Sequence, residues 1–313
     1  MRQYILSALM ILSSINLDAE PEFHLLGTMT GTEEYDNYYE LCHTDDINSD
    51  GYDDWVIGGE GHVDVYFGGA NLDTIRDLRL IPPLVPANTF GACVYSDDWN
   101  GDGYPDLAVG QPTWSGDTPD GIYSGGKVWV YWGGPVMDAI PDLELVVADL
   151  DAFTGWYYYF GSAITSGDLN GDGYQDLVAS APWDDIDARG RVYIYWGGPD
   201  MDDAWDVELE GTEGSQLGAS LAGEGDINQD SCDELLIGAP YSQLSEAGIA
   251  YLVNGGQDIN LSNSAIFEGD SGRPNLGFGI VSANLGDINN DGINDFGIST
   301  HYCPVRSPII TIG

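Results

Sequence analysis

Basic residues are scarce in this chain. Only eight of its 313 residues are lysine or arginine, against 52 aspartate and glutamate residues, so the formal net charge is −44. A surface this acidic repels nucleic acid and anionic lipid, so we expect neither as a partner. The aromatic content of 12% is too high for a disordered acidic tail. We therefore expect a folded, strongly acidic protein.

Long apolar runs are also missing. Residues 4–12 form an apolar stretch that is too short to span a bilayer, and no later segment is long enough, so we expect no membrane insertion. Arg2 precedes this stretch, and Leu17-Asp-Ala19 follows it in the manner of a cleavage site. We predict a signal peptide over 1–19 and a secreted or cell-surface domain over 20–313. The alternative is that residues 4–12 form a buried first strand or helix.

Motifs of familiar catalytic sites are lacking too. The chain has no Gly-x-Ser-x-Gly elbow, phosphate loop or zinc-binding helix, and its four histidines do not have paired metal-ligand spacing. Its four cysteines would permit disulfides in three connectivities after export. Nothing in the sequence indicates an active site, so we predict that the protein is not an enzyme.

Glycine, in contrast, is abundant, and it belongs to a nine-residue pattern that occurs five times. Oxygen-bearing side chains stand at positions 1, 3, 5 and 9, and four of the five copies have glycine at position 6. Alternating oxygen ligands around a glycine that turns the backbone are what calcium requires, and a carbonyl at position 7, as from Tyr174, can complete the set. The predicted ligands are Asp46, Asn48, Asp50, Asp54, Asp98, Asn100, Asp102, Asp106, Asp168, Asn170, Asp172, Asp176, Asp226, Asn228, Asp230, Glu234, Asp287, Asn289, Asp291 and Asp295.

A single copy of this pattern could be an Asp-Gly hairpin turn with surplus surface charge. Five copies, separated by 52, 70, 58 and 61 residues and each followed by an apolar run, favour an array of calcium loops between strands. We therefore predict up to five Ca²⁺ ions. The fourth copy has Ser231 in place of the loop glycine and Glu234 at position 9, so we expect it to be the weakest site.

Each repeat contains segments typical of four short antiparallel strands. An aromatic residue or leucine before glycine begins the first strand, as in Phe160-Gly161, and the calcium loop follows. The second strand ends near an Ala-Pro pair such as Ala181-Pro182, and the third alternates, as in residues 192–195. A Gly-Gly turn then leads to a short fourth strand. Four antiparallel strands repeated at this spacing predict an all-β propeller of four-stranded blades.

These features together resemble the FG-GAP repeat of the integrin alpha-chain propeller. The aromatic-Gly start, the D-x-N-x-D-G-x-x-D loop and the Gly-Ala-Pro turn carry the resemblance, which is most specific in repeats two, three and four. In the first repeat the start is degenerate (Tyr38-Tyr39-Glu40), and the fifth has Ser299-Thr-His301 in place of the proline turn. The resemblance covers residues 23–313.

The two ends of the chain predict how the ring closes. Residues 306–313 resemble a third strand, and residues 23–27 resemble a fourth strand that lies before repeat one. We expect the N-terminal strand to complete the last blade and give a five-bladed ring without free sheet edges. Because integrin propellers have seven blades, the alternative is a fragment of a longer array.

The resemblance implies that ligands bind on the face opposite the calcium loops. We expect that face to display Trp114, Trp183, Tyr241 and Tyr302 from one set of loops and Trp156, Tyr157, Tyr35 and Tyr38 from the other. Exposed aromatic rings beside carboxylates suit stacking on sugars or contacts with protein partners. The alternative is that these rings pack between blades, which is what we expect for Trp129, Trp132 and Trp196.

The sequence therefore predicts a calcium-stabilised binding or cell-adhesion module that recognises an extracellular protein or carbohydrate. One alternative is an enzyme acting on polysaccharide with a carboxylate pair on the aromatic face. A further alternative is a structural part of a larger surface assembly.

Overall fold

The computed structural model describes residues 8–13, 23–29, 38–70, 75–83, 89–113, 125–147, 159–183, 187–245, 247–270, 277–300 and 310–312. Within these residues the fold is almost entirely β, with one short 3-10 helix, η1 (Leu261–Asn263). The strands form antiparallel sheets that follow one another along the chain. The all-β prediction is confirmed.

Four sheets have four strands each, joined in sequence order. The first sheet contains β3 (Tyr38–Thr44), β4 (Asp54–Gly59), β5 (His62–Tyr66) and β6 (Leu78–Leu80); the second contains β7 (Cys93–Asp97), β8 (Asp106–Gln111), β9 (Lys127–Tyr131) and β10 (Leu143–Leu145). The third contains β11 (Ile164–Gly167), β12 (Asp176–Ala181), β13 (Arg191–Tyr195) and β14 (Val207–Glu210); the fourth contains β15 (Leu221–Gly225), β16 (Glu234–Ala239), β17 (Ile249–Val253) and β18 (Ala265–Glu268).

The remaining strands form two smaller sheets. The fifth sheet contains β19 (Val281–Gly286), β20 (Asp295–Ser299) and β21 (Ile310–Ile312), and a two-stranded sheet contains β1 (Ala8–Ser13) and β2 (Phe23–Met29). The prediction of a third strand near the C-terminus is confirmed by β21. Repeated four-stranded antiparallel sheets agree with a propeller-like arrangement of FG-GAP type.

The second strand of each full blade is buried on both faces, and so are most residues of the third. Such strands need apolar side chains on both sides, which explains continuous runs such as Leu107–Gly110 in β8. The apolar clusters lie between neighbouring sheets. One of them joins Val128 and Val130 of the second sheet to Tyr193 and Tyr195 of the third. The core is therefore divided among the blade junctions.

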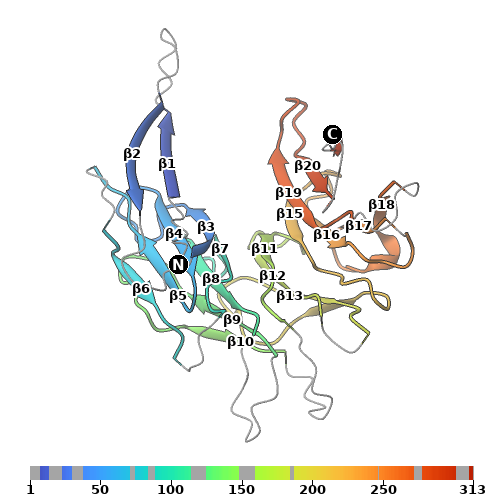
Figure 1. Ribbon diagram of the computed structural model, residues 1–313, viewed down its shortest axis with the longest axis horizontal. Coiled ribbons are helices and arrows are strands. Elements are labelled where there is room, and N and C mark those ends of the chain that lie inside the picture. Colours follow the sequence, from blue (N-terminus) through green and yellow to red (C-terminus); the bar gives the residue numbers. More distant parts are fainter. Residues whose placement is uncertain are drawn as a thin grey trace, which may run out of the picture.

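The sheets follow one another along an open arc, as Figure 1 shows. The first strands β3, β7, β11, β15 and β19 contact one another in that order, so the first strand of each blade lies next to its counterpart in the following blade. Antiparallel pairing places the connection between the first and second strands at the same end of each blade as the connection between the third and fourth. The calcium-loop pattern occupies the former connection in every blade.

The aromatic-Gly start of each repeat lies at a blade junction. Phe160 is fully buried, and its backbone N–H donates to the carbonyl of Gly125 in the preceding blade at 3.2 Å. Gly126 has a φ of +74°, and a Cβ there would collide with the backbone of Phe160. The equivalent glycines Gly190 and Gly248 face Leu217 and Phe278 in the same way. The motif is therefore required for close backbone approach between blades.

The prediction that the N-terminal strand completes the last blade is wrong. Residues 23–29 form β2, which pairs with β1 through pairs such as Ser13 with Phe23, and the fifth sheet has only β19, β20 and β21 among the described residues. A partner nearby in sequence takes the strand because closing a short loop costs less conformational entropy than closing a ring across the molecule. Part of the apolar N-terminal stretch is thus strand β1, while cleavage after residue 19 stays a prediction.

Candidate metal loops and binding face

The five predicted calcium loops lie between the first and second strand of their blades, each immediately before β4, β8, β12, β16 or β20. The second loop shows how the carboxylates organise the turn. Asp98 accepts hydrogen bonds at Oδ1 from the N–H groups of Gly101 (2.9 Å) and Asp102 (3.1 Å), and at Oδ2 from Gly103 (2.9 Å). Asp102 Oδ1 in turn accepts from the N–H of Tyr104 at 3.0 Å. These bonds hold positions 1 and 5 at fixed places on one turn.

The same network recurs in the other loops. In each, the carboxylate at position 1 accepts from the backbone N–H groups of positions 5 and 6 at 2.7–3.0 Å, as found for Asp46, Asp168, Asp226 and Asp287. The structure therefore brings positions 1 and 5 together in every loop, and in the first three loops the amide oxygen at position 3 accepts from the N–H of position 5 at 2.8–2.9 Å. Position 3 behaves differently in the last two loops, where the side-chain amides of Asn228 and Asn289 donate to the carboxylate at position 9 of the same loop.

Position 6 adopts the left-handed backbone conformation expected from the glycine pattern. The four glycines Gly51, Gly103, Gly173 and Gly292 have φ between +88° and +91°, and Ser231 follows them at +75°. The positive φ of Ser231 is the physical basis for expecting the fourth loop to be the weakest site. Ser49, Gln229 and Asn290 at position 4 also have positive φ, which was not predicted because these residues are not glycine.

Position 9 has a structural role that sequence reasoning missed. Asp106 is completely buried, and its Oδ2 accepts hydrogen bonds from the N–H groups of Trp99 (3.0 Å) and Asn100 (3.3 Å) at the start of the loop. Its Oδ1 accepts from Gly133, in the turn after the third strand, at 2.9 Å. Asp54 and Asp176 make the same bonds with Gly68 and Gly197. One carboxylate thus ties the loop to the Gly-Gly turn of its own blade.

Burial raises the pKa of these position-9 carboxyl groups. The pKa of Asp106 and of Asp176 rises to about 7, and that of Asp54 to about 6, because burial outweighs the hydrogen bonds from backbone N–H groups. The negative charge at position 5 of each loop raises these pKa values further. The pKa of Glu234 is raised for the same reasons. Positions 5 and 9 are therefore close enough to repel each other.

The donor set of these loops fits a hard cation. No group of three or more His, Cys, Asp or Glu side chains in the described residues is close enough to hold a metal by itself. Carboxylate and amide oxygens nevertheless lie together at positions 1, 3 and 5 of the first three loops, and each carboxylate oxygen has lone pairs beyond those used by backbone N–H groups. Position 9 fits less directly, because its two oxygens accept from backbone N–H groups in the first three loops, and in the last two loops one of them accepts from the asparagine at position 3.

The described basic side chains pair with carboxylates outside the loops. Each of the five described lysine and arginine residues pairs with a carboxylate of β5, β10 or β14: Arg76 and Arg79 with Asp64, Lys127 with Glu144, Arg189 with Glu210 and Arg191 with Glu208. The charge of the loops therefore has to be balanced by something other than these side chains.

The opposite face carries some of the predicted aromatic residues. Trp183, after β12, and Tyr241, after β16, are each 47% exposed, and both follow an Ala-Pro pair. Tyr38 begins strand β3, so it does not lie in a loop. Trp114, Trp156, Tyr302, Tyr35 and Tyr157 lie outside the described residues.

The tryptophans assigned to packing between blades are located as predicted. Trp129 is fully buried, and its Nε1–H donates to Gln111 Oε1 at 3.0 Å. Trp132 and Trp196 pack at the margins of the apolar clusters between blades. Among the residues that the structure describes, there is no helix with the length and apolar character needed to span a membrane.

Known proteins share these repeats. The FG-GAP repeat model matches residues 94–131, 160–195 and 217–253, which run from the first to the third strand of three successive blades. Integrin alpha-5 of Xenopus laevis is 32% identical over 206 residues, covering 62% of this chain and 19% of the integrin. Integrin alpha-3 of Cricetulus griseus is 34% identical over 165 residues, covering 49% of this chain and 16% of the integrin.

A human phosphatidylinositol-glycan-specific phospholipase D is 27% identical over 224 residues, covering 62% of this chain and 25% of that protein. The chain thus spans a quarter or less of these relatives. Among solved structures, BBS1N in complex with ARL6DN matches with a TM-score of 0.52 at 11% identity, covering 95% of this chain and 83% of that one, which is a likeness of fold. Three segments of the chain therefore match the FG-GAP repeat, and the chain is similar in sequence to integrin alpha chains.

Proposed function

We propose that this protein is a calcium-stabilised binding or adhesion module that acts outside the cell, secreted or at the cell surface. It recognises a protein or glycan through the face opposite the calcium loops. The observation that carries this proposal is the pair Trp183 and Tyr241, large rings that stay half exposed at equivalent places in two successive blades. Repetition of an exposed ring at one edge of the arc favours a contact surface over chance exposure.

In this proposal calcium supports the surface without contacting the ligand. Positions 1, 3 and 5 of each loop would hold the ion, and a bound cation would offset the repulsion between positions 5 and 9. Because the position-9 carboxylate of the first three loops also holds the Gly-Gly turn, an ordered loop favours an ordered blade. Similarity to integrin alpha chains supports a role in recognition.

The direct test is a binding screen against glycans and extracellular proteins, run in millimolar calcium and in chelator. The double variant Trp183→Ala/Tyr241→Ala should lose binding while keeping its melting temperature, because both side chains are exposed. The matched control is Ile140→Ala, which should bind normally. It truncates an apolar side chain that is 70% exposed and lies on the calcium-loop side of the second blade. Unchanged binding by the double variant would refute the assignment of this face.

An enzyme acting on a glycan is the second candidate, favoured by the similarity to a phospholipase D named for its phosphatidylinositol-glycan substrate. Turnover of a glycan that disappears when one carboxylate on the aromatic face is neutralised, with folding intact, would support this alternative. Binding without turnover would support the recognition module.

A further inference from the structure

In the third, fourth and fifth repeats, the residue just before the aromatic or leucine residue that begins the repeat has a left-handed backbone conformation. Its φ is +55° at Tyr159, +52° at Gln216 and +62° at Gly277. The carbonyls of Gln216 and Gly277 each accept a hydrogen bond from the N–H three residues later, at 3.1 and 3.2 Å. Glycine therefore suffices for this turn, whereas glutamine adopts the same conformation under strain. A strained residue that the turn does not need directs attention to its side chain.

Gln216 lies in the connection between β14 and β15, on the face opposite the calcium loops. Its N–H donates to the carbonyl of Ala188 at 3.0 Å, and Ala188 itself has a φ of +47°. The carbonyl of Ser215 accepts from the N–H of Tyr241 at 3.4 Å. The turn that carries Gln216 is therefore fixed between the loop after β12 and the loop after β16, beside an exposed ring of the proposed binding face.

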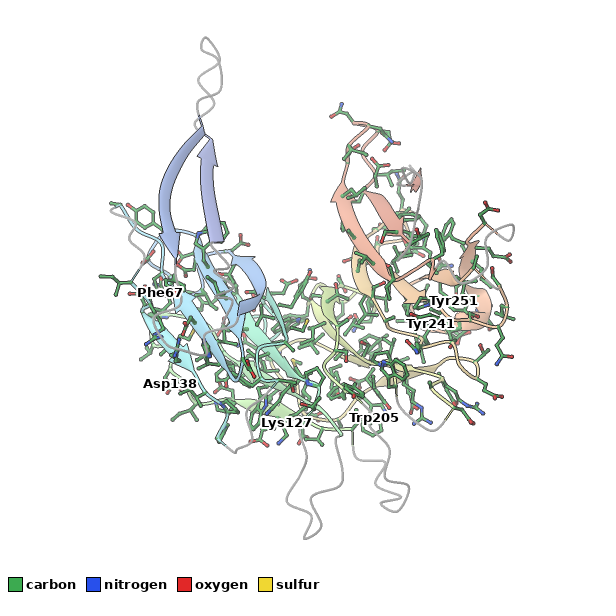
Figure 2. All side chains as sticks on the ribbon, viewed as in Figure 1. Phe67, Lys127, Asp138, Trp205, Tyr241 and Tyr251 are labelled. Atoms are coloured by element: carbon green, nitrogen blue, oxygen red, sulfur yellow. The ribbon has the colours of Figure 1, made fainter. Side chains whose placement is uncertain are left out.

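Two side-chain amides and one aromatic ring are available at this place. Gln216 is partly buried, whereas Gln243 and Tyr241 are exposed. A Cβ on Gly214, in the same turn as Gln216, would lie 3.7 Å from Nε2 of Gln243, so this amide borders the turn. Neither glutamine side chain makes a hydrogen bond within the part of the chain that the structure describes. Figure 2 shows Tyr241 within the fourth blade.

The charged groups around the turn are mainly acidic. Glu213 is exposed, and the side chains of Asp187 and Glu210 are partly exposed. Arg189 Nη2 lies 3.7 Å from Asp187 Oδ2, and Arg189 Nη1 lies 3.3 Å from Glu210 Oε1, so one positive charge is shared between two carboxylates. An anionic ligand would therefore meet net negative charge here.

We propose that Gln216, Gln243 and Tyr241 form a subsite for an uncharged sugar of a glycan. This inference rests on the proposed function, because it names the class of ligand for one part of the same face. A primary amide offers two N–H donors and an acceptor oxygen, which suit sugar hydroxyls because each hydroxyl both donates and accepts. The tyrosine ring can cover the apolar C–H face of the sugar, while its hydroxyl group stays at the rim.

The same groups argue against two other occupants. Uronic acids and sulfated sugars are disfavoured by the neighbouring carboxylates. An apolar protein surface would cover both amides without giving them hydrogen-bond partners, and an amide removed from water in this way costs free energy. A neutral sugar satisfies the amides and the ring together.

The test uses the full chain in millimolar calcium and four neutral hexasaccharides as probes, composed of glucose, mannose, galactose or xylose. A hexamer of galacturonate is the anionic counterpart. Isothermal titration calorimetry measures each dissociation constant. We expect at least one neutral hexasaccharide to bind, and the galacturonate hexamer to bind at least tenfold more weakly.

The protein variant is Gln216→Gly, which removes the amide and relieves the backbone conformation at the same time. It should raise the melting temperature and weaken binding of the neutral hexasaccharide at least fivefold. The matched control is Gln229→Gly, because Gln229 has a φ of +63° and lies in the fourth calcium loop, at the other end of the same blade. This control should also raise the melting temperature, while its affinity stays within twofold of that of the unmodified chain.

Three results would overturn the inference. The first is that none of the four neutral hexasaccharides binds, and the second is that the galacturonate hexamer binds as tightly as the best of them. The third is equal affinity of Gln216→Gly and the unmodified chain, which would show that the amide does not contact the sugar. An extracellular protein bound through Trp183 and Tyr241, without any neutral hexasaccharide, would refute the subsite and leave the proposed function intact.

Discussion

At the scale of single residues, the first glycine of each Gly-Gly turn decides how closely the turn approaches its loop. A Cβ on Gly133 or Gly197 would fall far inside van der Waals contact with the backbone carbonyl at position 8 of the loop, supplied by Pro105 or Gln175. The same glycines donate their N–H groups to Asp106 and Asp176. The turn therefore admits no side chain at this position, whatever its polarity.

Gly197→Ala should reduce the free energy of unfolding by about 3 kcal/mol, because the added methyl group has to push backbone away from backbone. Gly69→Ala is the matched control, since a Cβ at Gly69 meets nothing within 4 Å and the backbone there does not have positive φ. Urea unfolding of both variants measures the difference. Equal stability of the two would contradict the steric argument.

Ser231 is the one position-6 residue in the five loops that is not glycine, and it carries a left-handed backbone conformation. Ser231→Gly should stabilise the protein by about 1 kcal/mol by relieving that conformation. Gly173→Ser, the reciprocal change in the third loop, should destabilise it by a similar amount. Thermal melts in calcium and in chelator would check both variants. The melting temperature should rise for Ser231→Gly and fall for Gly173→Ser, and shifts of the same sign would contradict the prediction.

The raised pKa values of Asp106 and Asp176 predict a pH dependence in the absence of metal. The folded chain keeps these protons up to about pH 7, whereas unfolded carboxyl groups lose them near pH 4. The folded state thus binds more protons in this window, so the free energy of unfolding should fall as pH rises from 5 to 8, by on the order of 5 kcal/mol for the two groups together.

General repulsion among the acidic residues gives a slope of the same sign, so the comparison has to be with a variant. Asp106→Asn/Asp176→Asn should show a flatter dependence over pH 5 to 8, measured by urea unfolding in chelator. An unaltered slope would mean that these two groups do not titrate in this range.

At the scale of elements, the first three blade junctions repeat a backbone contact. The carbonyl at position 2 of one loop accepts from the second glycine of the next blade's turn: Ile47 from Gly134, Trp99 from Gly198 and Leu169 from Gly256, each at 2.7 Å. The side chains at this position are buried in the clusters between blades. The calcium loop is thus also part of the interface between blades.

Phe160→Ala should cost about 4 kcal/mol, because the ring is fully buried at the junction between the second and third blades, where it contacts Tyr193 edge-on at 5.6 Å between ring centres. Ile266→Ala, on an exposed side chain of β18, is the control and should change stability by less than about 1 kcal/mol. Calorimetry of both variants decides the matter, and a small effect at Phe160 would show that the junction does not limit stability.

Sequence patterns predicted the elements well and their long-range partners poorly. The period of the acidic loops located all five connections between first and second strands, and glycine at position 6 predicted positive φ. The role of Asp106 was missed because its partner Gly133 lies 27 residues away, and no local signal connects them. The pairing of β2 was predicted wrongly because strand pattern alone does not choose between two competing partners.

At the scale of the whole molecule, charge is segregated. The described basic side chains pair with acids of β5, β10 and β14, whereas the loops gather carboxylates at one end of every blade. Like charges at that end oppose folding in the absence of cations. Divalent cations should therefore affect the stability of the entire array.

Removal of calcium by a chelator should lower the melting temperature markedly. If each of five loops binds with a dissociation constant on the order of 10⁻⁴ M, millimolar calcium adds roughly 1.4 kcal/mol per loop and about 7 kcal/mol in all. Differential scanning calorimetry in calcium and in excess chelator measures this, with monovalent salt held constant to separate screening from binding. An unchanged melting temperature would exclude a structural role for calcium.

The backbone contact between Gly126 and Phe160 recurs between Gly190 and Leu217. Excision of residues 160–216 would present Leu217 to Gly126 in the place that Phe160 now occupies, with the same backbone atoms offered to the same surface. The blades are therefore interchangeable modules. A gene encoding such a chain can gain or lose one whole repeat and still preserve the backbone contacts between neighbouring blades. This requires that the repeat boundary lies just before the aromatic or leucine residue that begins a repeat.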